Sequence, residues 1–316
     1  MLNKNNPLVS VGIPTYNRPE ELKVSLDLIS KQTYSNIEII VSDNKSEHSD
    51  EIARIVRNIQ TKDSRIKFYQ QEKNIGSIGN FKYVLEQASA EYFMWAADDD
   101  ELENNYIEVL MDSLCSKDDC IFVVSGYDVV DKMNEPVIRT NFTKYLFEIP
   151  GDSAFIRMKN YVTQPDYCGK SKILWGIHNI FTLREAVDEV FVGLPKRDNI
   201  TWAEIPIEFR LLAKGNLSVV EDTLFHANLL PSSEGLREGA LFNKREVEMC
   251  RRSFDAYRRS VKSSSQLSDN EKVTLYRMLK KEEVSIVFRM VIFGVIRRCS
   301  PSIARIIKKT WMYFLR

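Results

Sequence analysis

The sequence predicts an α/β protein with a mostly parallel sheet, helices on both faces of that sheet, and a C-terminal helical appendage. In the first half, short β-rich runs alternate with segments whose apolar residues recur at helical spacing, which is typical of a parallel sheet. After Leu241 the pattern is helical, with breaks near residues 263–269 and at Pro301. The 316 residues suit one large domain with an appendage.

Apolar runs give the predicted strands of the first half in order, at residues 8–13, 37–41, 66–69, 92–97 and 121–125. Pro14 is predicted to end the first of them. Helices are predicted between these strands. Their apolar faces include Leu22 and Leu26, Ile52 and Val56, Phe81 and Leu85, and Tyr106 and Leu110.

Prolines interrupt the pattern between residues 134 and 172, so no element is predicted there. Further strands are predicted at 174–181 and 217–220, and further helices at 184–190 and 204–214. Gly215 is expected to end the second of these helices.

Composition excludes some classes of protein. The 44 basic and 44 acidic residues balance, so no overall positive field favours nucleic acid. The five cysteines show neither a disulfide framework nor metal-ligand spacing, which fits a reducing cytosol. Residues 1–7 are polar and do not form a signal peptide. We therefore expect a cytoplasmic protein without a nucleic-acid partner.

Residues 92–101 read YFMWAADDDE, an apolar run followed by four acids. The run predicts a buried strand, and the acids then lie where that strand leaves the sheet, which is where ligands bind in open α/β sheets. Carboxylates this close repel one another, and a hard divalent cation such as Mg²⁺ or Mn²⁺ would relieve the repulsion. The alternative is a solvated acidic turn at the start of the next helix.

Several short motifs occur in a fixed order. They are VSVGIPTYN at 9–17, QTY at 32–34, IEIIVSDNKS at 37–46, NIG at 74–76, EYF at 91–93, the aspartates at 98–100, and Glu204 before FRLLAKG at 209–215. In this order and spacing the chain resembles the inverting family 2 glycosyltransferases, of the type that builds bacterial surface polysaccharides. The resemblance covers about residues 8–225 and does not extend to the C-terminal helices.

The resemblance implies a GT-A-like fold with a Rossmann-type sheet. It places a glycosyltransferase domain at 1–235, with a nucleotide-sugar-binding half at 8–131 and an acceptor-side half at 132–235, before a helical region at 236–316. The implied activity moves a sugar from a nucleoside diphosphate donor, with a UDP-sugar favoured, to an acceptor hydroxyl of a glycan or a lipid-linked saccharide. The configuration at the anomeric carbon would be inverted, as in capsule or O-antigen synthesis.

The predicted donor site lies at the ends of the first two strands. Pro14, Tyr16 and Asn17 follow the first strand, and the Tyr16 ring could stack on a base. Asp43 ends the second strand and could accept a base N–H, or it could instead form an Asx turn. The resemblance places Asn80 near the same cleft, although a helix cap is almost equally expected.

The acidic cluster departs from the Asp-x-Asp-Asp pattern that is common in such families, because Ala96 and Ala97 precede it. Asp98 and Asp99 are predicted to contact the donor. Asp99 and Asp100 are predicted to hold Mn²⁺ or Mg²⁺ against the diphosphate, with no firm choice among the three aspartates. His226 is a further candidate metal ligand, because some related folds complete the metal site there.

Glu204 stands where similar enzymes carry the last acid of a Glu-Asp pair, and here the pair reads Ala203-Glu204. Inversion in a single displacement needs a base on the face opposite the leaving diphosphate, and Glu204 is the candidate. A helix N-terminal carboxylate without a catalytic role is the alternative. Asp198 is the second choice of base.

Two other functions remain open at this stage. The departures at Ala96, Ala97 and Ala203 allow a catalytically weak nucleotide-sugar-binding or assembly subunit. A nucleotidyltransferase shares the sheet and the acidic cluster, but the first strand is not followed by a Gly-rich loop with Lys or Arg that could hold a triphosphate.

The last part of the chain is basic. Residues 284–316 combine an apolar stretch with seven basic side chains and no acid, which suits an anionic membrane surface such as the inner face of a cell membrane. The stretch 284–296 is too short to span a bilayer. A helix whose apolar face packs on the catalytic domain or on a homodimer partner is the alternative.

Overall fold

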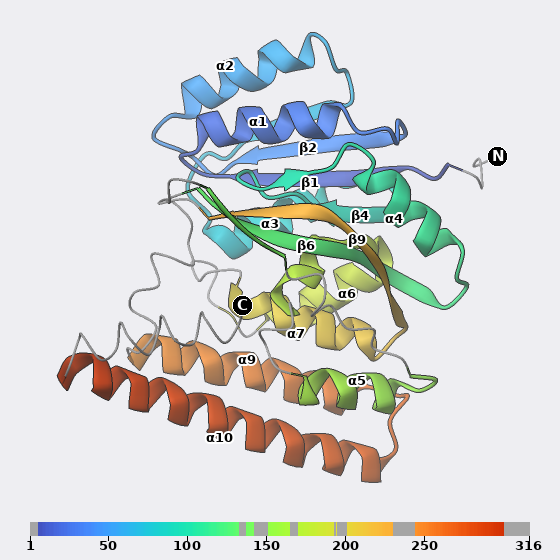
Figure 1. Ribbon diagram of the computed structural model, residues 1–316, viewed down its shortest axis with the longest axis vertical. Helices are drawn as coiled ribbons and strands as arrows, with labels where there is room; N and C mark the ends of the chain where they lie inside the picture. The colour runs from blue at the N-terminus through green and yellow to red at the C-terminus, as the bar shows by residue number, and fades with distance from the viewer. Residues whose placement is uncertain are drawn as a thin grey trace.

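The computed structural model describes residues 6–132, 137–141, 151–164, 170–192, 194, 201–229 and 244–299. Within this part of the chain, nine strands form one mixed sheet (Figure 1). The main path has the order β3-β2-β1-β4-β8-β6-β9-β5, and β7 pairs with β6 off this path. The candidate site depends on where the strands of this sheet end.

One half of the sheet is parallel. Its strands are β1 (Val9–Thr15), β2 (Ile37–Asp43), β3 (Ile66–Gln70) and β4 (Tyr92–Trp95). In register, Val9 lies opposite both Ile37 and Tyr92, and Thr15 lies opposite Asp43. Parallel strands end at the same edge, so the segments after β1, β2 and β4 meet there. Helices α1 (Pro19–Ser30), α2 (Ser49–Gln60) and α3 (Ser77–Glu86) make the connections.

The other half of the sheet is mixed. It contains β5 (Glu101–Leu102), β6 (Cys120–Asp131), β7 (Ile138–Asn141), β8 (Ile177–Asn179) and β9 (Asn216–Leu229). Strand β8 runs antiparallel to both β4 and β6, and β5 runs antiparallel to β9. Long strands β6 and β9 pair in parallel with bulges. Strand β5 places the residues after β4 against the far end of β9.

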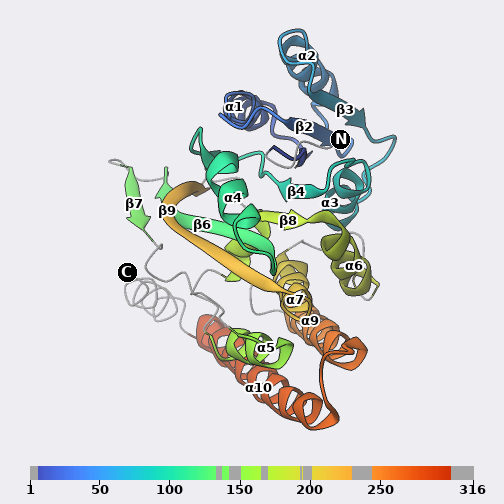
Figure 2. The same ribbon diagram turned by 90° about the vertical axis from the view of Figure 1, so that its right-hand side faces the viewer.

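Helices cover both faces of the sheet (Figures 1 and 2). Apolar residues of α1, α2 and α4 (Tyr106–Cys115) share one buried cluster with the sheet. Those of α3, α6 (Ile180–Phe191) and α7 (Thr201–Leu212) form a second cluster on the other face. Helices α5 (Ala154–Thr163), α9 (Lys244–Ser263) and α10 (Asp269–Cys299) add an outer layer to this second cluster. The predicted fold class is confirmed.

Some predicted boundaries are wrong. Pro14 does not end β1, which continues to Thr15. The pairing of β1 with β4 ends at Gly12, so the missing N–H of Pro14 does not remove a hydrogen bond to β4. The strand predicted at 174–181 is a 3₁₀ turn (Lys170–Trp175), the three-residue β8 and the start of α6. Asn179 caps α6 by accepting the N–H groups of Phe181 and Thr182, so the apolar run turns helical. Helix α5 was not predicted.

Within the described residues the C-terminal helices are as predicted, with a break between Ser263 and Asp269, and the predicted break at Pro301 lies outside those residues. Buried Leu275, Leu279 and Met290 of α10 join the second apolar cluster. The predicted boundary at residues 235 and 236 lies outside the described residues. In the described ranges, every helix falls short of the length or the hydrophobicity that a transmembrane span requires.

The close approach of β6 and β8 at Gly176 predicts that a larger residue there destabilises the fold. A Cβ at this position would lie 2.1 Å from the carbonyl oxygen of Val123 and 2.7 Å from a side-chain carbon of Val124, so β6 and β8 would have to separate. Gly176→Ala is expected to lower the free energy of unfolding in urea by about 2 kcal/mol or more. Gly79→Ala is the control, because the nearest contact of its Cβ is Ile75 at 3.3 Å. An equal effect in the two variants would contradict the close approach of β6 and β8.

Candidate active site

The ends of β1, β2 and β4 are joined by hydrogen bonds. Asn80 of α3 accepts the hydroxyl of Ser42 at 2.6 Å and donates to the backbone oxygen of Ser42 at 2.9 Å. The Thr15 hydroxyl donates to Asp98 Oδ2 at 2.8 Å across 83 residues of sequence. Asn80 is therefore a buried tie between α3 and β2 and not a helix cap. The predicted residues Pro14, Asp43 and Asp98 share this edge.

Tyr16 and Asn17 lie in the turn after β1. Tyr16 is 43% exposed, which leaves room for a stacking partner. Asn17 has a positive φ of 58° and accepts the N–H of Glu47 at 2.7 Å, so it joins the turn after β1 to the turn after β2. Asn17 thus has a structural role in the ligand-free chain.

Asp43 is fully buried. Its Oδ1 accepts the N–H of Ser46 at 3.1 Å, and its Oδ2 accepts the Ser49 hydroxyl at 2.5 Å. These bonds hold the turn before α2, as the Asx-turn alternative implies. A contact of Asp43 with a base stays a prediction.

Asp98 and Asp99 converge on one cation. Arg18 Nη1 donates to Asp98 Oδ1 at 2.8 Å and to Asp99 Oδ2 at 2.9 Å. Asp98 is buried, and its burial raises the pKa of the carboxyl, an effect that Arg18 opposes and the charge of Asp99 increases. The two carboxylates therefore depend on a positive charge between them.

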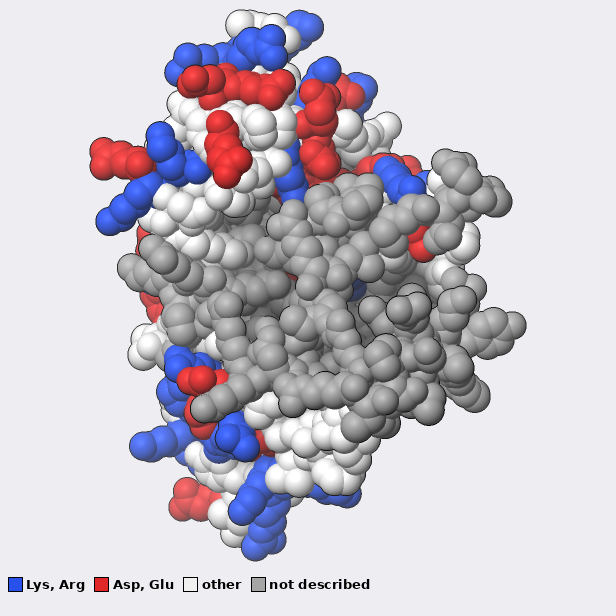
Figure 3. Space-filling view, turned by 90° about the vertical axis from the view of Figure 1, so that its left-hand side faces the viewer, with Lys and Arg blue, Asp and Glu red and all other residues white. Residues whose placement is uncertain are grey.

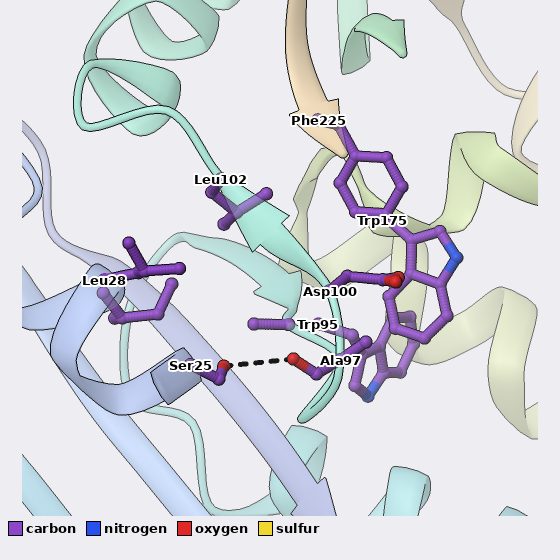
Figure 4. Close-up of a pocket in the computed structure, with 10 residues that line it drawn as sticks. Ser25, Leu28, Trp95, Ala97, Asp100, Leu102, Trp175 and Phe225 are labelled. Carbon is purple, nitrogen blue, oxygen red and sulfur yellow. Dashed lines mark hydrogen bonds between the residues drawn. The ribbon is translucent and has the colours of Figure 1, made fainter. Parts of the chain in front are cut away.

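Asp100 lies apart from this pair, at a small cavity lined by Trp95, Trp175 and Phe225 (Figure 4). Its Oδ1 accepts the backbone N–H of Asn228 at 2.9 Å. Burial raises the pKa of Asp100 to about 7, against the lowering effect of the Lys172 charge. Asp98 and Asp99 thus share Arg18, whereas Asp100 has a separate partner in Asn228.

The structure places His226 away from this cavity. Its ring nitrogens lie 2.7 Å from Asp128 Oδ1 and 3.0 Å from Glu103 Oε1. Neighbouring strand residues point to opposite faces, and Phe225 lines the cavity beside Asp100. Asp100 and His226 therefore lie on opposite faces of β9.

Glu204 lies in the first turn of α7 and is buried. One turn further along, Glu208 accepts the Tyr161 hydroxyl at 2.6 Å, and burial raises its pKa well above the usual range, with a further contribution from the Glu204 charge. Lys170 Nζ lies 4.8 Å from the centre of the Tyr161 ring. Asp198 lies outside the described residues.

Three residues that act on the aspartates were not predicted from the sequence, namely Arg18, Lys172 and Asn228. Arg18 had a signal, because it is a basic residue directly after the motif that ends in Asn17 and directly before a helix. No sequence pattern marks Lys172 or Asn228. Lys172 comes near Asp100 because the 3₁₀ turn packs there, and Asn228 does so because β9 is long enough to extend to it.

The acid pair fits a hard divalent cation. Hard cations take carboxylate oxygens, and Mg²⁺ is commonly held by one or two carboxylates together with substrate phosphates. Asp98 and Asp99 already direct one oxygen each at the positive charge of Arg18. Among the residues that the structure describes, no set of three or more His, Cys, Asp or Glu side chains is arranged for a metal. The protein would thus supply part of the coordination, and phosphate and water the rest.

The chain also matches a known protein family. The profile described as "Glycosyl transferase family 2" matches residues 10–191, which is more than half of the chain. The chain belongs to this family.

Curated relatives match about a third of the chain. A "GalNAc(5)-diNAcBac-PP-undecaprenol beta-1,3-glucosyltransferase" of Campylobacter jejuni is 40% identical over 106 residues, 33% of this chain and 34% of the relative. The "Putative colanic acid biosynthesis glycosyl transferase WcaA" of Escherichia coli is 31% identical over 108 residues, 34% of this chain and 38% of that protein. The matched region thus spans little more than a third of these relatives.

Solved structures share the fold. Crystal structures of S. aureus TarS align with TM-scores of 0.59, in complex with UDP at 16% identity and with UDP-GlcNAc at 15%. The UDP complex covers 84% of this chain and 69% of that chain, and the UDP-GlcNAc complex covers 88% and 72%. Identities this low show the fold alone.

The burial of His178 predicts how the stability of the protein depends on pH. His178 is fully buried, its ring stacks on Phe122 at 5.7 Å, and its Nε2 lies 3.1 Å from the Leu174 oxygen, so it is a core residue. Burial lowers its pKa to about 4 from the ordinary value of about 6.5. As the pH falls below 6.5, His178 therefore binds a proton in the unfolded chain but not in the folded chain. The free energy of unfolding then decreases.

We expect the stability difference between wild type and His178→Gln to shrink by about 2 kcal/mol between pH 7 and pH 5. Urea unfolding of both proteins at each pH measures this difference, and it removes the effects of the buried acids because both proteins share them. The same comparison between pH 7 and pH 8 should show no change. A difference that is equal at pH 5 and pH 7 would mean that His178 is protonated in the fold.

Proposed function

We propose that this chain transfers a sugar from a nucleoside diphosphate donor, with UDP-sugars favoured, to an acceptor hydroxyl with inversion, in the synthesis of a bacterial surface polysaccharide. The observation that carries the proposal is the pair of carboxylates, Asp98 and Asp99, directed at one cation at the carboxyl edge of the parallel strands. The undecaprenol-linked and colanic acid names of the relatives support a lipid-linked or glycan acceptor. UDP and UDP-GlcNAc in the TarS structures are in keeping with the donor class.

Each residue of the donor site has a separate proposed role. The exposed ring of Tyr16 stacks on the base, and the turn after β1, held by Asn17, brings it there. Asp43 lies at the adjacent strand end and is the candidate partner for a base N–H. Asp98 and Asp99 hold Mn²⁺ or Mg²⁺. Asp100 is the third aspartate of the acidic row. When bound, the cation neutralises the negative charge that develops on the leaving diphosphate.

Glu204 is the proposed base. It is buried in the first turn of α7, where a carboxylate can be held in position to take the acceptor proton. Glu208 stands one turn behind it in the same buried cluster. Burial of Glu204 is also the observation that favours the second candidate, a nucleotide-sugar-binding subunit without turnover.

Glu204→Gln is expected to bind the donor normally and to lose at least about 100-fold in turnover, because an amide keeps the shape but cannot accept a proton. Release of nucleoside diphosphate measures turnover, and thermal shift across nucleotide sugars measures donor binding. Glu248→Gln, an exposed helix position on α9, is the matched control. If Asp198→Asn loses turnover and Glu204→Gln does not, Asp198 is the base. If wild type binds donors without releasing diphosphate, the binding-subunit function holds.

We also propose that α10 binds an anionic membrane surface. Val284, Phe288, Val291 and Val295 are more than half exposed and recur at helical spacing along one face. Arg277, Lys280 and Lys281 are exposed one to two turns before them. Figure 3 shows blue Lys and Arg side chains, with some red Asp and Glu side chains among them, over the lower part of the molecule, where α9 and α10 lie. An apolar helix face beside basic residues suits anionic lipid.

Serine at Val284, Phe288 and Val295 together should release the protein from anionic vesicles, with at least about a tenfold loss in binding, because the apolar contact is removed. These side chains are exposed, so the melting temperature should not fall. Val273→Ser, an exposed position at the start of α10, is the control. Co-sedimentation at low and high salt measures the effect. A wild type that does not sediment, or that forms a dimer which the triple variant breaks, would assign this face to a partner chain.

A further inference from the structure

Arg18 stands where the proposed cation would bind. We propose that Arg18 is an internal counter-ion which occupies the cation site of the ligand-free protein, and that a divalent cation binds by displacing it. This inference rests on the proposed metal site, and it adds a competition between a side chain and the metal that the family assignment does not contain.

The geometry makes the two cations mutually exclusive. One nitrogen, Arg18 Nη1, lies 2.8 Å from an oxygen of Asp98 and 2.9 Å from an oxygen of Asp99. Mg²⁺ binds carboxylate oxygens at about 2.0–2.1 Å and therefore needs the same point between the two acids. A divalent ion there would lie against the guanidinium, and like charges at such a distance repel strongly in a partly buried site.

Asp98 keeps a second hydrogen bond when Arg18 leaves. Asp98 is also held through its other oxygen by the Thr15 hydroxyl at 2.8 Å, so its carboxylate keeps its place when Nη1 is gone. Arg18 lies outside the regular elements, between the turn at Asn17 and Pro19 at the start of α1. Its side chain is 17% exposed and thus has a path to solvent.

A purely structural ion pair would behave differently from a counter-ion. In a structural pair, removal of Arg18 leaves the acids unpaired and destabilises the fold, and metal affinity does not rise. In the exchange that we propose, the metal must break the hydrogen bonds of Arg18 before it binds. The free energy needed for this lowers the measured metal affinity. Removal of Arg18 then strengthens metal binding, while the metal restores the lost stability.

The test is binding of Mn²⁺ alone to the full chain, measured from the free-ion EPR signal, for wild type and Arg18→Met. We expect Arg18→Met to bind at least about tenfold more tightly, which corresponds to about 1.4 kcal/mol. Arg18→Lys, which keeps the charge, should bind less tightly than Arg18→Met. Arg65→Met is the matched control, because Arg65 forms a comparable pair with Asp63 at 2.7 Å outside the site. Equal or weaker binding by Arg18→Met, or no binding at all, overturns the inference.

A measurement on wild type covers the case in which Arg18→Met does not fold. Phenylglyoxal modifies accessible arginines, and peptide mapping reports the rate at Arg18. We expect Mn²⁺ to accelerate modification of Arg18 and to leave Arg65 unchanged. No acceleration at Arg18 overturns the inference. Donor binding and diphosphate release are measured separately, so the transferase function can stand when the exchange fails, and the exchange can stand when no sugar is transferred.

Discussion

Carboxylates packed side by side at the end of an apolar strand are stable only if each one meets a cation or a hydrogen-bond donor. This constraint organises the molecule around residues 98–101. Arg18 and the Thr15 hydroxyl reach the first acids from β1 and the turn after it. Lys132 and Asn228 reach Glu101 and Asp100 from the ends of β6 and β9. The acidic row thus holds the parallel half of the sheet to the mixed half.

The sequence was sufficient for the parallel half, because its strands are short runs rich in β-branched and aromatic residues and its helices carry regular apolar faces. It was insufficient for the mixed half. Strand β9 continues from Leu217 through Glu221, Asp222 and Thr223, and such a polar stretch reads as a loop. Its strand conformation comes from pairing with β6, which is a tertiary effect that no local pattern reports.

The candidate site divides in the same way. The order of the motifs made Asp98, Asp99 and Glu204 candidates, because these residues follow strands or open helices. It could not decide which acids share a cation, since that depends on side-chain direction. His226 shows the difficulty. It follows Phe225 in sequence, yet the alternation of β9 turns its ring toward Asp128 and away from the cavity at Asp100.

The hydrogen bond from the Asn228 backbone to Asp100 joins residues 128 positions apart. Contacts at such separation form late in folding, because a long loop must close first. At synthesis rates of about 5–20 residues per second, Asn228 is made about 6–25 s after Asp100. During this interval the parallel strands of the first half can pair, but the acidic segment lacks the strand that fixes it. The nascent chain therefore holds the edge of the parallel strands with an unfinished charged loop, and this region acquires its final shape only when β9 is added.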